Sequence, residues 1–138
     1  MIITQISTFL ENVAGRLADV ATLFADNHIN LRAMSIADTT DFGILRMVVD
    51  KPEEAIEILK SAGFTAKATD VLAVAVDDKP GGLAAVCTIL RNRCVSIEYL
   101  YASLEQRSNK AFVIVKVNDV QAGKRALEMG GITESPRF

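Results

Sequence analysis

Hydrophobic residues along this chain follow either a helix-like or a strand-like spacing, and the two kinds of stretch occur in the same order in each half of the chain. Helix-like stretches carry apolar residues at positions i, i+3, i+4 and i+7, the spacing of a helix that is buried on one side. In the first half these residues are Leu17, Val20, Ala21 and Phe24, and in the second half they are Leu83, Val86, Cys87 and Leu90. Strand-like stretches consist of branched and apolar residues between turn residues. Each half therefore predicts the order strand, helix, strand, strand, helix, strand.

Turn and capping residues set the predicted boundaries. In the first half, strands are predicted over 2–10, 29–37, 44–49 and 65–70, with a hairpin turn at 38–41. The first helix opens after Gly15, and the second begins at Pro52 because proline fits the first turn of a helix. In the second half, strands are predicted over 71–76, 95–103 and 111–117, with a helix over 120–129 and a short tail to Phe138.

The two halves are copies of one pattern. At an offset of 66 residues, Gly15, Leu17, Ala18, Val20 and Thr22 correspond to Gly81, Leu83, Ala84, Val86 and Thr88. After a two-residue insertion the offset is 68, and Val49, Leu59, Gly63 and Thr65 correspond to Val117, Leu127, Gly131 and Thr133. The insertion lies in 103–110, opposite 37–42, and predicts a longer hairpin turn. Residues 1–70 and 71–138 are therefore predicted to be two domains of the same fold.

The element order specifies the fold class. A βαββαβ order with right-handed crossovers gives an antiparallel sheet with both helices on one face, which is the ferredoxin-like arrangement of an α+β protein. Each half is expected to leave the other face of its sheet uncovered. No glycine, proline or serine occurs between Lys67 and Val76, so the halves are expected to be rigidly coupled.

Composition narrows the class of protein. Half of the 138 residues are hydrophobic, but the longest apolar run, 71–76, is far shorter than the roughly 20 residues that span a bilayer. The net charge is −2 without a cluster of lysine and arginine, which argues against a nucleic-acid or membrane partner. Cys87 and Cys94 offer no disulfide framework, and the first residues do not resemble a signal peptide. We expect a cytoplasmic protein that associates with itself.

Patterns typical of enzymes and metal carriers are missing from the sequence. It has no nucleophile beside a base, no glycine-rich phosphate loop and no paired acid motif, so no catalysis, cofactor or metal is expected. Packing is the favoured explanation of Cys87, ahead of a metal or redox role. His28, the only histidine, is expected to cap a helix or face solvent, with a ligand contact as the weaker alternative. The third strands share one aromatic residue, which argues against RNA recognition.

The strand-to-helix loop of the second half, 77–83, has the composition of an anion site. Pro80 and Gly81 stand at the predicted helix start, where backbone N–H groups and the helix dipole favour a carboxylate. Asp77 and Asp78 beside them could receive an ammonium group, so the loop suits an amino-acid zwitterion. Alternatively, Asp78 caps a helix that begins at Pro80. The sequence leaves both explanations open.

Two segments in each half resemble the ACT domain, a small-molecule-binding regulatory module. In the second half they are Asp77-Asp78-Lys79-Pro80-Gly81-Gly82-Leu83 and Val95-Ser96-Ile97-Glu98-Tyr99, and in the first half they are Glu11-Asn12-Val13-Ala14-Gly15-Arg16-Leu17 and Ile29-Asn30-Leu31-Arg32-Ala33. The resemblance covers nearly the whole chain as a tandem ACT protein. The first copy departs from the pattern by carrying Ala14 where proline is usual.

The resemblance implies a pairing of the two domains and a ligand site between them. ACT domains typically pair through their second strands into one eight-stranded antiparallel sheet with the helices on one face. One implied site combines Glu11, Asn12, Val13, Ala14 and Gly15 with Ser96 and Tyr99, and the other combines Asp78, Lys79, Pro80 and Gly81 with Asn30 and Met34. Asn12 and Asn30 fall where serine-binding ACT domains of a biosynthetic dehydrogenase carry amide ligands, and Asp78 and Ser96 replace them in the second copy. The two sites are therefore expected to differ chemically.

The function that follows is amino-acid sensing without catalysis. The expected partners are a free amino acid, further copies of the chain and a regulated enzyme in another chain. A scaffold that uses the uncovered sheet face and binds no small molecule is the alternative, and a small hydrolase of the same fold is a distant third. Ile97, Tyr99 and Tyr101 occupy every second position of one predicted strand and therefore share one face of the sheet. Packing and a place in a ligand pocket both remain open for the two tyrosines.

Overall fold

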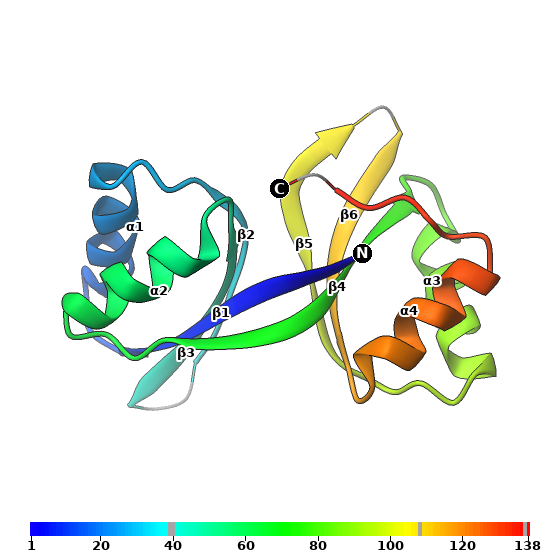
Figure 1. Cartoon of the computed structure of the whole chain (residues 1–138), viewed down its shortest axis with the longest axis horizontal. Coiled ribbons are helices and arrows are strands. Elements are labelled where there is room, and N and C mark those ends of the chain that lie inside the picture. Colours follow the sequence, from blue (N-terminus) through cyan, green and yellow to red (C-terminus); the bar gives the residue numbers. More distant parts are fainter. Residues whose placement is uncertain (39–40, 108, 137) are drawn as a thin grey trace. The chain divides into compact units, whose positions relative to one another are not determined.

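The computed structural model describes residues 1–38, 41–107, 109–136 and 138, and it divides into two compact units (Figure 1). The first unit comprises Thr4–Thr69 together with Phe138, and the second comprises Met1–Ile3 together with Asp70–Arg137. Within the described residues there are four helices and six strands. The α+β class predicted from the sequence is confirmed.

The first unit contains strands β1 (Ile2–Glu11), β2 (Leu31–Asp38) and β3 (Phe42–Val49) with helices α1 (Arg16–Asp26) and α2 (Pro52–Ser61). Strand β3 lies between β1 and β2 and pairs antiparallel with both, so that Met47 stands opposite Ile6 on one side and Met34 on the other. Pro52 occupies the first turn of α2, as predicted. The predicted turn at 38–41 lies partly outside the described residues.

The second unit repeats this order with strands β4 (Lys67–Asp77), β5 (Ile97–Arg107) and β6 (Lys110–Val117) and helices α3 (Gly82–Asn92) and α4 (Val120–Met129). Strand β6 pairs antiparallel with β4 and with β5. Helix α4 has the predicted bounds, whereas β5 begins two residues later and ends four residues later than the predicted strand over 95–103.

The predicted count of eight strands is wrong, since the described residues form six. The strands predicted over 65–70 and 71–76 are one continuous strand, β4, because no glycine or proline interrupts the chain there. The described residues that follow α4, 130–136 and 138, contain no strand.

Two separate segments bond to β4 within the second unit. The Ala73 N–H donates to the Met1 carbonyl oxygen at 2.7 Å, and the Ala75 N–H donates to the Glu134 carbonyl oxygen at 3.3 Å. Ile2 packs against the hydrophobic core of this unit. Residues from the first few positions of the sequence thus complete the fold of the second repeat.

Each unit has its own hydrophobic core between its helices and one face of its strands. In the first unit the fully buried core residues include Ile6, Val20, Phe24, Leu45, Met47, Ala55 and Leu59. In the second unit they include Leu72, Val74, Val86, Leu90, Val115, Val117 and Leu127. The predicted helix stripes are confirmed at the buried residues Val20, Phe24, Val86 and Leu90. They are wrong at Ala21, which is exposed, and at the first turns, where Leu17 and Leu83 are 37% and 41% exposed. Cys87 is half-buried and lies outside the core.

The strand face opposite the helices carries apolar residues at its centre. In the second unit Ala73 stands opposite Ile114, and Ala75 stands opposite Phe112. These residues alternate with core residues, so they point away from the helices, and yet all are at most 5% exposed.

Candidate functional site

The two strand-to-helix loops share one backbone conformation. Gly15 precedes α1 with φ of 91°, and Gly81 precedes α3 with φ of 89°. In the first loop the Val13 N–H donates to the Glu11 carbonyl, and in the second the Lys79 N–H donates to the Asp77 carbonyl, each at 2.8 Å. No other group lies within 4 Å of where a Cβ at either glycine would stand, so the left-handed φ is what requires glycine.

Asp78 does not cap a helix, contrary to one of the two explanations of this residue. Helix α3 begins at Gly82, its N-cap is Gly81, and no side chain bonds to its first N–H groups. The Asp78 N–H instead donates to the Asn109 carbonyl at 2.8 Å, which ties the loop to the hairpin between β5 and β6. In the first unit the Asn12 N–H makes the corresponding bond to the Asp41 carbonyl at 3.0 Å.

Asn30 and Ser96 occupy equivalent places ahead of β2 and β5. The Asn30 N–H donates to the Asp50 carboxylate at 3.0 Å, and the Ser96 N–H donates to the Asn118 side-chain oxygen at 2.9 Å. The carbonyl oxygens of Asn30 and Ser96 accept from the N–H groups of the same two partners. Their backbones are fixed in this way, while both residues are exposed.

Met34 and Tyr99, the two larger residues predicted to contact a ligand, are half-buried in β2 and β5. Met34 packs against the core of the first unit, opposite the fully buried Met47. Tyr99 stands opposite Lys116, which forms an ion pair with Glu98 at 3.2 Å. Packing against the core of the first unit therefore buries much of the Met34 side chain.

The structure brings the predicted site residues together in groups within each unit. Glu11–Gly15 form one loop and Asp78–Gly81 form the other. Asn30 and Met34 lie in the first unit, whereas Ser96 and Tyr99 lie in the second. The combination of each loop with residues of the other unit remains a prediction.

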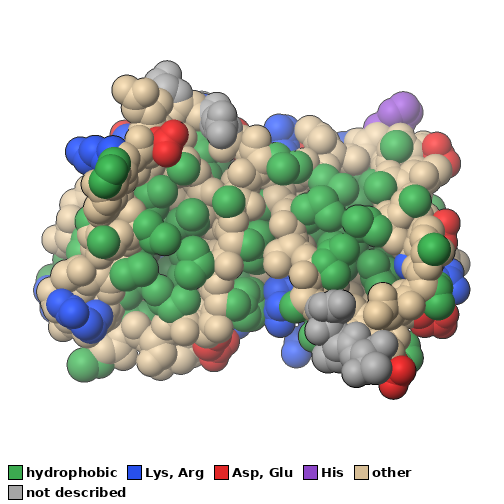
Figure 2. All heavy atoms as spheres, turned by 180° about the vertical axis from the view of Figure 1, so that it is seen from behind, with side chains coloured by type: hydrophobic (Ala, Val, Ile, Leu, Met, Phe, Trp, Pro, Cys, Tyr) green, Lys and Arg blue, Asp and Glu red, His purple; other side chains and the backbone are tan. Residues whose placement is uncertain are grey.

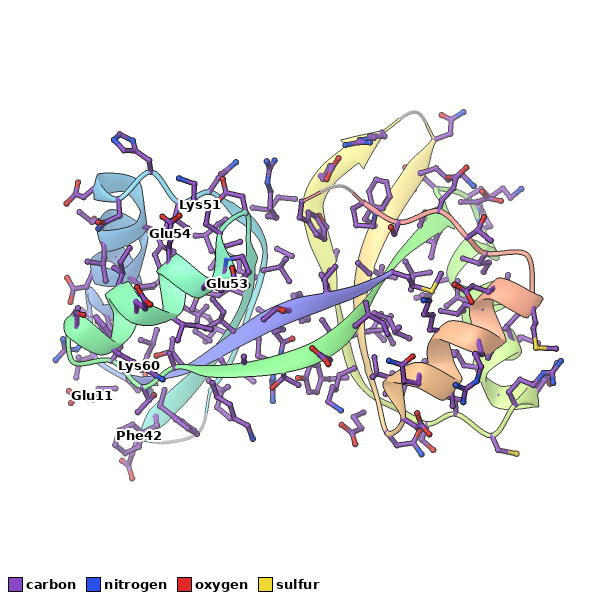
Figure 3. The ribbon with its side chains drawn as sticks, in the orientation of Figure 1. Glu11, Phe42, Lys51, Glu53, Glu54 and Lys60 are labelled. Carbon is purple, nitrogen blue, oxygen red and sulfur yellow. The ribbon has the colours of Figure 1, made fainter. Side chains whose placement is uncertain are left out.

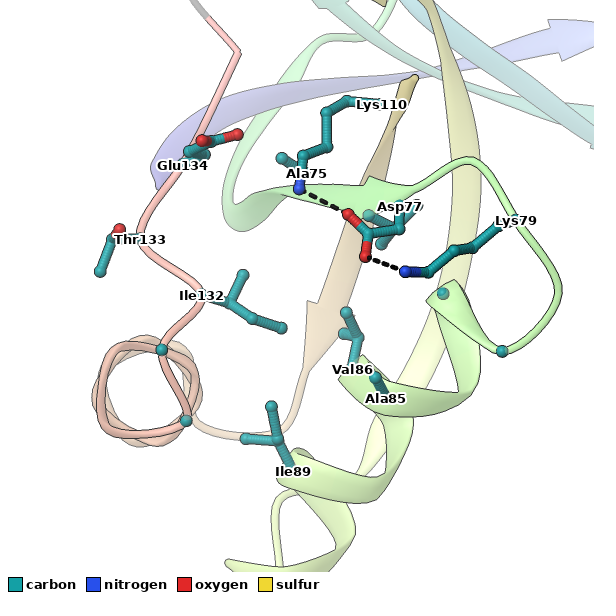
Figure 4. Close-up of a pocket in the computed structure, with 15 residues that line it drawn as sticks. Ala75, Asp77, Lys79, Ala85, Val86, Ile89, Lys110, Ile132, Thr133 and Glu134 are labelled. Carbon is teal, nitrogen blue, oxygen red and sulfur yellow. Dashed lines mark hydrogen bonds and ion pairs between the residues drawn. The ribbon is translucent and has the colours of Figure 1, made fainter. Parts of the chain in front are cut away.

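Asp77, at the end of β4, is the centre of a charge cluster in the second unit. The Lys110 Nζ lies 2.6 Å from one carboxylate oxygen of Asp77, and the Lys79 Nζ lies 3.2 Å from the other (Figure 4). The hydrogen bond from Lys110, followed by that from Lys79, lowers the pKa of Asp77 below its usual 3.8. The same bond to Asp77 raises the pKa of Lys110 above its usual 10.5.

The first loop carries a weaker arrangement of charges. The Arg16 guanidinium lies 3.5 Å from the Glu11 carboxylate and 3.6 Å from that of Asp19, and all three side chains are at least 40% exposed. Exposed ion pairs of this kind contribute little to stability. Figure 3 shows Glu11 close to Phe42, and the two residues pair across β1 and β3.

A cavity of about 470 Å³ adjoins the second loop. Of the residues predicted from the sequence, Lys79 and Gly81 line it, whereas Asp78 and Pro80 do not. Sequence reasoning missed Lys110 and the segment Gly130–Glu134, which also line it. The matches of Gly131 to Gly63 and of Thr133 to Thr65 in the repeat were the signals that this segment is a structural part of the module.

The amino-acid sequence matches one family over most of its length. Residues 1–129 match the family described as the ACT domain pair. The chain belongs to the ACT domain pair family. The resemblance inferred from the two loop segments is thereby confirmed. No curated protein matches the chain.

Solved structures share the fold of this chain. Protein BT0572 from Bacteroides thetaiotaomicron is 36% identical, with a TM-score of 0.89 over 96% of this chain and 90% of that one. The regulatory subunit of aspartate kinase from Thermus thermophilus, in its ligand-free form, is 18% identical, with a TM-score of 0.66 over 94% and 97%. That from Thermus flavus is 16% identical, with a TM-score of 0.64 over 95% of each chain. The latter two share the fold.

Metal ligands, membrane-spanning helices and basic patches would each indicate another kind of site in this ACT domain pair. The residues that the structure describes contain no grouping of three or more His, Cys, Asp or Glu side chains suited to a metal ion. Among the same residues, none of the helices has the length and hydropathy that a membrane span requires. On the face shown in Figure 2, lysine and arginine side chains are scattered over each unit and form no basic patch.

Proposed function

We propose that this ACT domain pair is a regulatory sensor of a free amino acid and has no catalytic activity of its own. The match to the ACT domain pair family over residues 1–129 carries the proposal. The shared fold with regulatory subunits of aspartate kinase agrees with it. The regulated enzyme would then be a separate protein.

The amino acid is proposed to bind where the two ACT domains meet, at the two strand-to-helix loops. The left-handed glycines, Gly15 and Gly81, keep each loop free of side-chain atoms where a carboxylate would approach the backbone. Asn12, Ser96 and Tyr99 would complete one site with Glu11, Val13 and Ala14. Asn30 and Met34 would complete the other with Asp78, Lys79 and Pro80.

The two proposed sites differ in charge and in rigidity. Asn12 and Asn30 are neutral amides, whereas the corresponding residues of the second copy are the acid Asp78 and the hydroxyl Ser96. The second loop contains Pro80, which restricts its backbone, and the first loop has Ala14 at that position. Unequal affinities follow, and a single dominant site is the expected result.

Binding would regulate the partner through a change in domain pairing or in self-association. A regulatory ligand typically couples to a second equilibrium by about 1 to 3 kcal/mol, which corresponds to a 5- to 150-fold change in affinity. The fixed backbones of Asn30 and Ser96 provide rigid positions from which such a change could be transmitted.

Isothermal titration calorimetry with the common amino acids tests this proposal. We expect one of them to bind, and we expect Asn12→Ala or Asn30→Ala to weaken binding about tenfold through the loss of one hydrogen bond to a charged group. Lys60→Ala, on the exposed last turn of α2, is the matched control and should bind as the wild type does. Binding that survives Asn12→Ala, Asn30→Ala and Ser96→Ala alike would rule out the site between the domains.

A further inference from the structure

The cavity of the second unit lies wholly within one repeat, between the end of β4, the first turns of α3 and the segment after α4 (Figure 4). In Figure 4 the side chains of Val86, Ile89 and Ile132 point into the same space and form an apolar wall. The charged side chains Asp77 and Lys110 lie on the other side of it. At about 470 Å³ the cavity has the size of a small-molecule site.

Four charged residues of alternating sign surround this cavity: Asp77, Lys79, Lys110 and Glu134. Asp77 contacts both lysines, and Glu134 acts on Lys110 electrostatically. Each ammonium group has three hydrogen-bond donors, so bonds to Asp77 leave donors for a ligand. The four charges sum to zero. A purely anionic ligand would be repelled by Asp77 and Glu134, and a purely cationic ligand would be repelled by the two lysines.

Two glycines let the walls of the cavity come close together. A Cβ at Gly82 would collide with the Asp77 carbonyl oxygen, and a Cβ at Gly130 would lie 2.6 Å from the Ile89 side chain. The first turn of α3 can therefore approach the end of β4 in this way only without a side chain at Gly82, whereas a side chain at Gly130 would require the Ile89 side chain to move.

The first repeat contains the corresponding cavity, which is smaller, at about 380 Å³, and is lined differently. Phe9, Arg16, Phe42, Ala62 and Phe64 occupy the positions of Ala75, Gly82, Lys110, Gly130 and Ile132. Glu11 and Arg16 are its charged residues. Corresponding parts of the two copies thus form an aromatic cavity in the first and a cavity of paired charges in the second.

We propose that the cavity of the second unit binds a small zwitterion with an apolar portion, as in an apolar α-amino acid. The carboxylate of the ligand would accept from Lys79 and Lys110, and its ammonium group would donate to Asp77 and Glu134. Its apolar portion would cover Ile89 and Ile132. This site lies inside one unit. It shares Lys79 and Gly81 with one of the sites proposed between the two ACT domains, whereas Lys110, Ile132 and Glu134 belong to this cavity alone.

Titration of the ¹⁵N-labelled full chain with leucine, isoleucine, valine and methionine, followed by amide spectra, tests the proposal. Amide signals of Gly130, Gly131 and Thr133 should shift with one of these amino acids. Lys110→Met and Asp77→Asn should each weaken that effect about tenfold, because each removes a charged partner of the ligand. Dispersed spectra of both variants would show that they remain folded.

Two further variants separate a specific site from loss of structure. Ile132→Phe installs the residue that the first repeat has at this position, so it should narrow the cavity and weaken binding while all four charges remain. Lys60→Met removes an exposed lysine of the first unit and should leave the titration unchanged.

The outcomes distinguish this site from the one between the domains. Shifts confined to the loop at Asn12 and to Asn30 and Ser96, with none at 130–134, would overturn the inference and leave the proposed function intact. Stronger binding to Asp77→Asn would also overturn it, because a simple anion gains when the competing carboxylate is removed. Shifts at 130–134 that persist in Asn12→Ala and Asn30→Ala would support it independently of the proposed function.

Discussion

Asp77 is the residue with the most defined charge environment in the second loop. It is bonded to lysines from two different elements, the loop before α3 and the start of β6. Its carboxyl pKa is lowered below 3.8, chiefly by the hydrogen bond from Lys110. Folding therefore favours the ionised form of Asp77, so the ion pair of Asp77 with Lys110 contributes to the stability of the folded state.

The stabilisation from Asp77 should depend on pH in one direction. A lowered pKa contributes stability that is present above the unfolded value, near 3.8, and is lost as the pH falls through the folded value. We expect Asp77→Asn to lower the melting temperature at neutral pH and to have no effect once the pH is below the folded pKa. Circular dichroism melts across this range measure the difference, with Asp78→Asn as the control. A constant difference at all pH values would contradict the role of the ion pair.

Two adjacent glycines are required for different reasons. Gly82→Ala should lower the free energy of unfolding by about 3 kcal/mol, because its Cβ collides with the Asp77 carbonyl. Gly81→Ala should lower the free energy of unfolding by only about 1 to 2 kcal/mol, because the alanine would adopt an unfavourable left-handed φ but would collide with no other group. Urea unfolding of both variants measures the two values, and an equal or reversed order would show that α3 begins differently.

At the residue scale the sequence predicted the glycine-containing loops but not the contacts of each acid. A carboxylate beside a proline and a glycine is compatible with a helix cap, a ligand contact or an ion pair, as Asp77 and Asp78 show. The choice is made by Lys110, which lies far along the chain and reaches Asp77 only after β4 and β6 pair. Sequence spacing holds no information on that distance.

At the scale of the helices and strands, two aspartates near helix starts can be compared directly. The Asp119 side chain accepts from the Ala122 N–H at 3.0 Å and caps α4, whereas Asp78 caps no helix. Asp119→Ala should cost about 0.5 to 2 kcal/mol of stability, and Asp78→Ala should stay within about 0.5 kcal/mol of the wild type. Chemical denaturation measures both. A larger loss for Asp78→Ala would restore its role as a cap.

The helices were predictable from the sequence because their signals are local. Apolar spacing located α1 and α3, and Pro52 located the start of α2. The strand count was not predictable, since whether 65–70 and 71–76 form one strand or two depends on pairing with distant segments. Met1 and Glu134 bond to β4 at neighbouring positions, and nothing in the local pattern of either segment indicates this.

At the scale of the whole molecule, the first three residues of the chain belong to the second unit. Ile2 is half-buried against the core of the second unit, so Ile2→Ala should destabilise that unit by about 1 to 2 kcal/mol. Hydrogen exchange should show faster exchange in α3 and β6. Ile36→Ala is the control, because Ile36 is 46% exposed in the first unit. Faster exchange confined to the first unit would contradict this assignment.

The most direct measurement for the whole account is a thermal melt of the chain in the presence of each common amino acid. A ligand bound only to the folded state adds about 2.7 kcal/mol of stability at a hundredfold excess over its dissociation constant. For a chain of this size we expect one amino acid to raise the melting temperature by roughly 2 to 8 °C. If no amino acid raises it, while another protein does, the chain is an interaction scaffold and the sensor account is wrong.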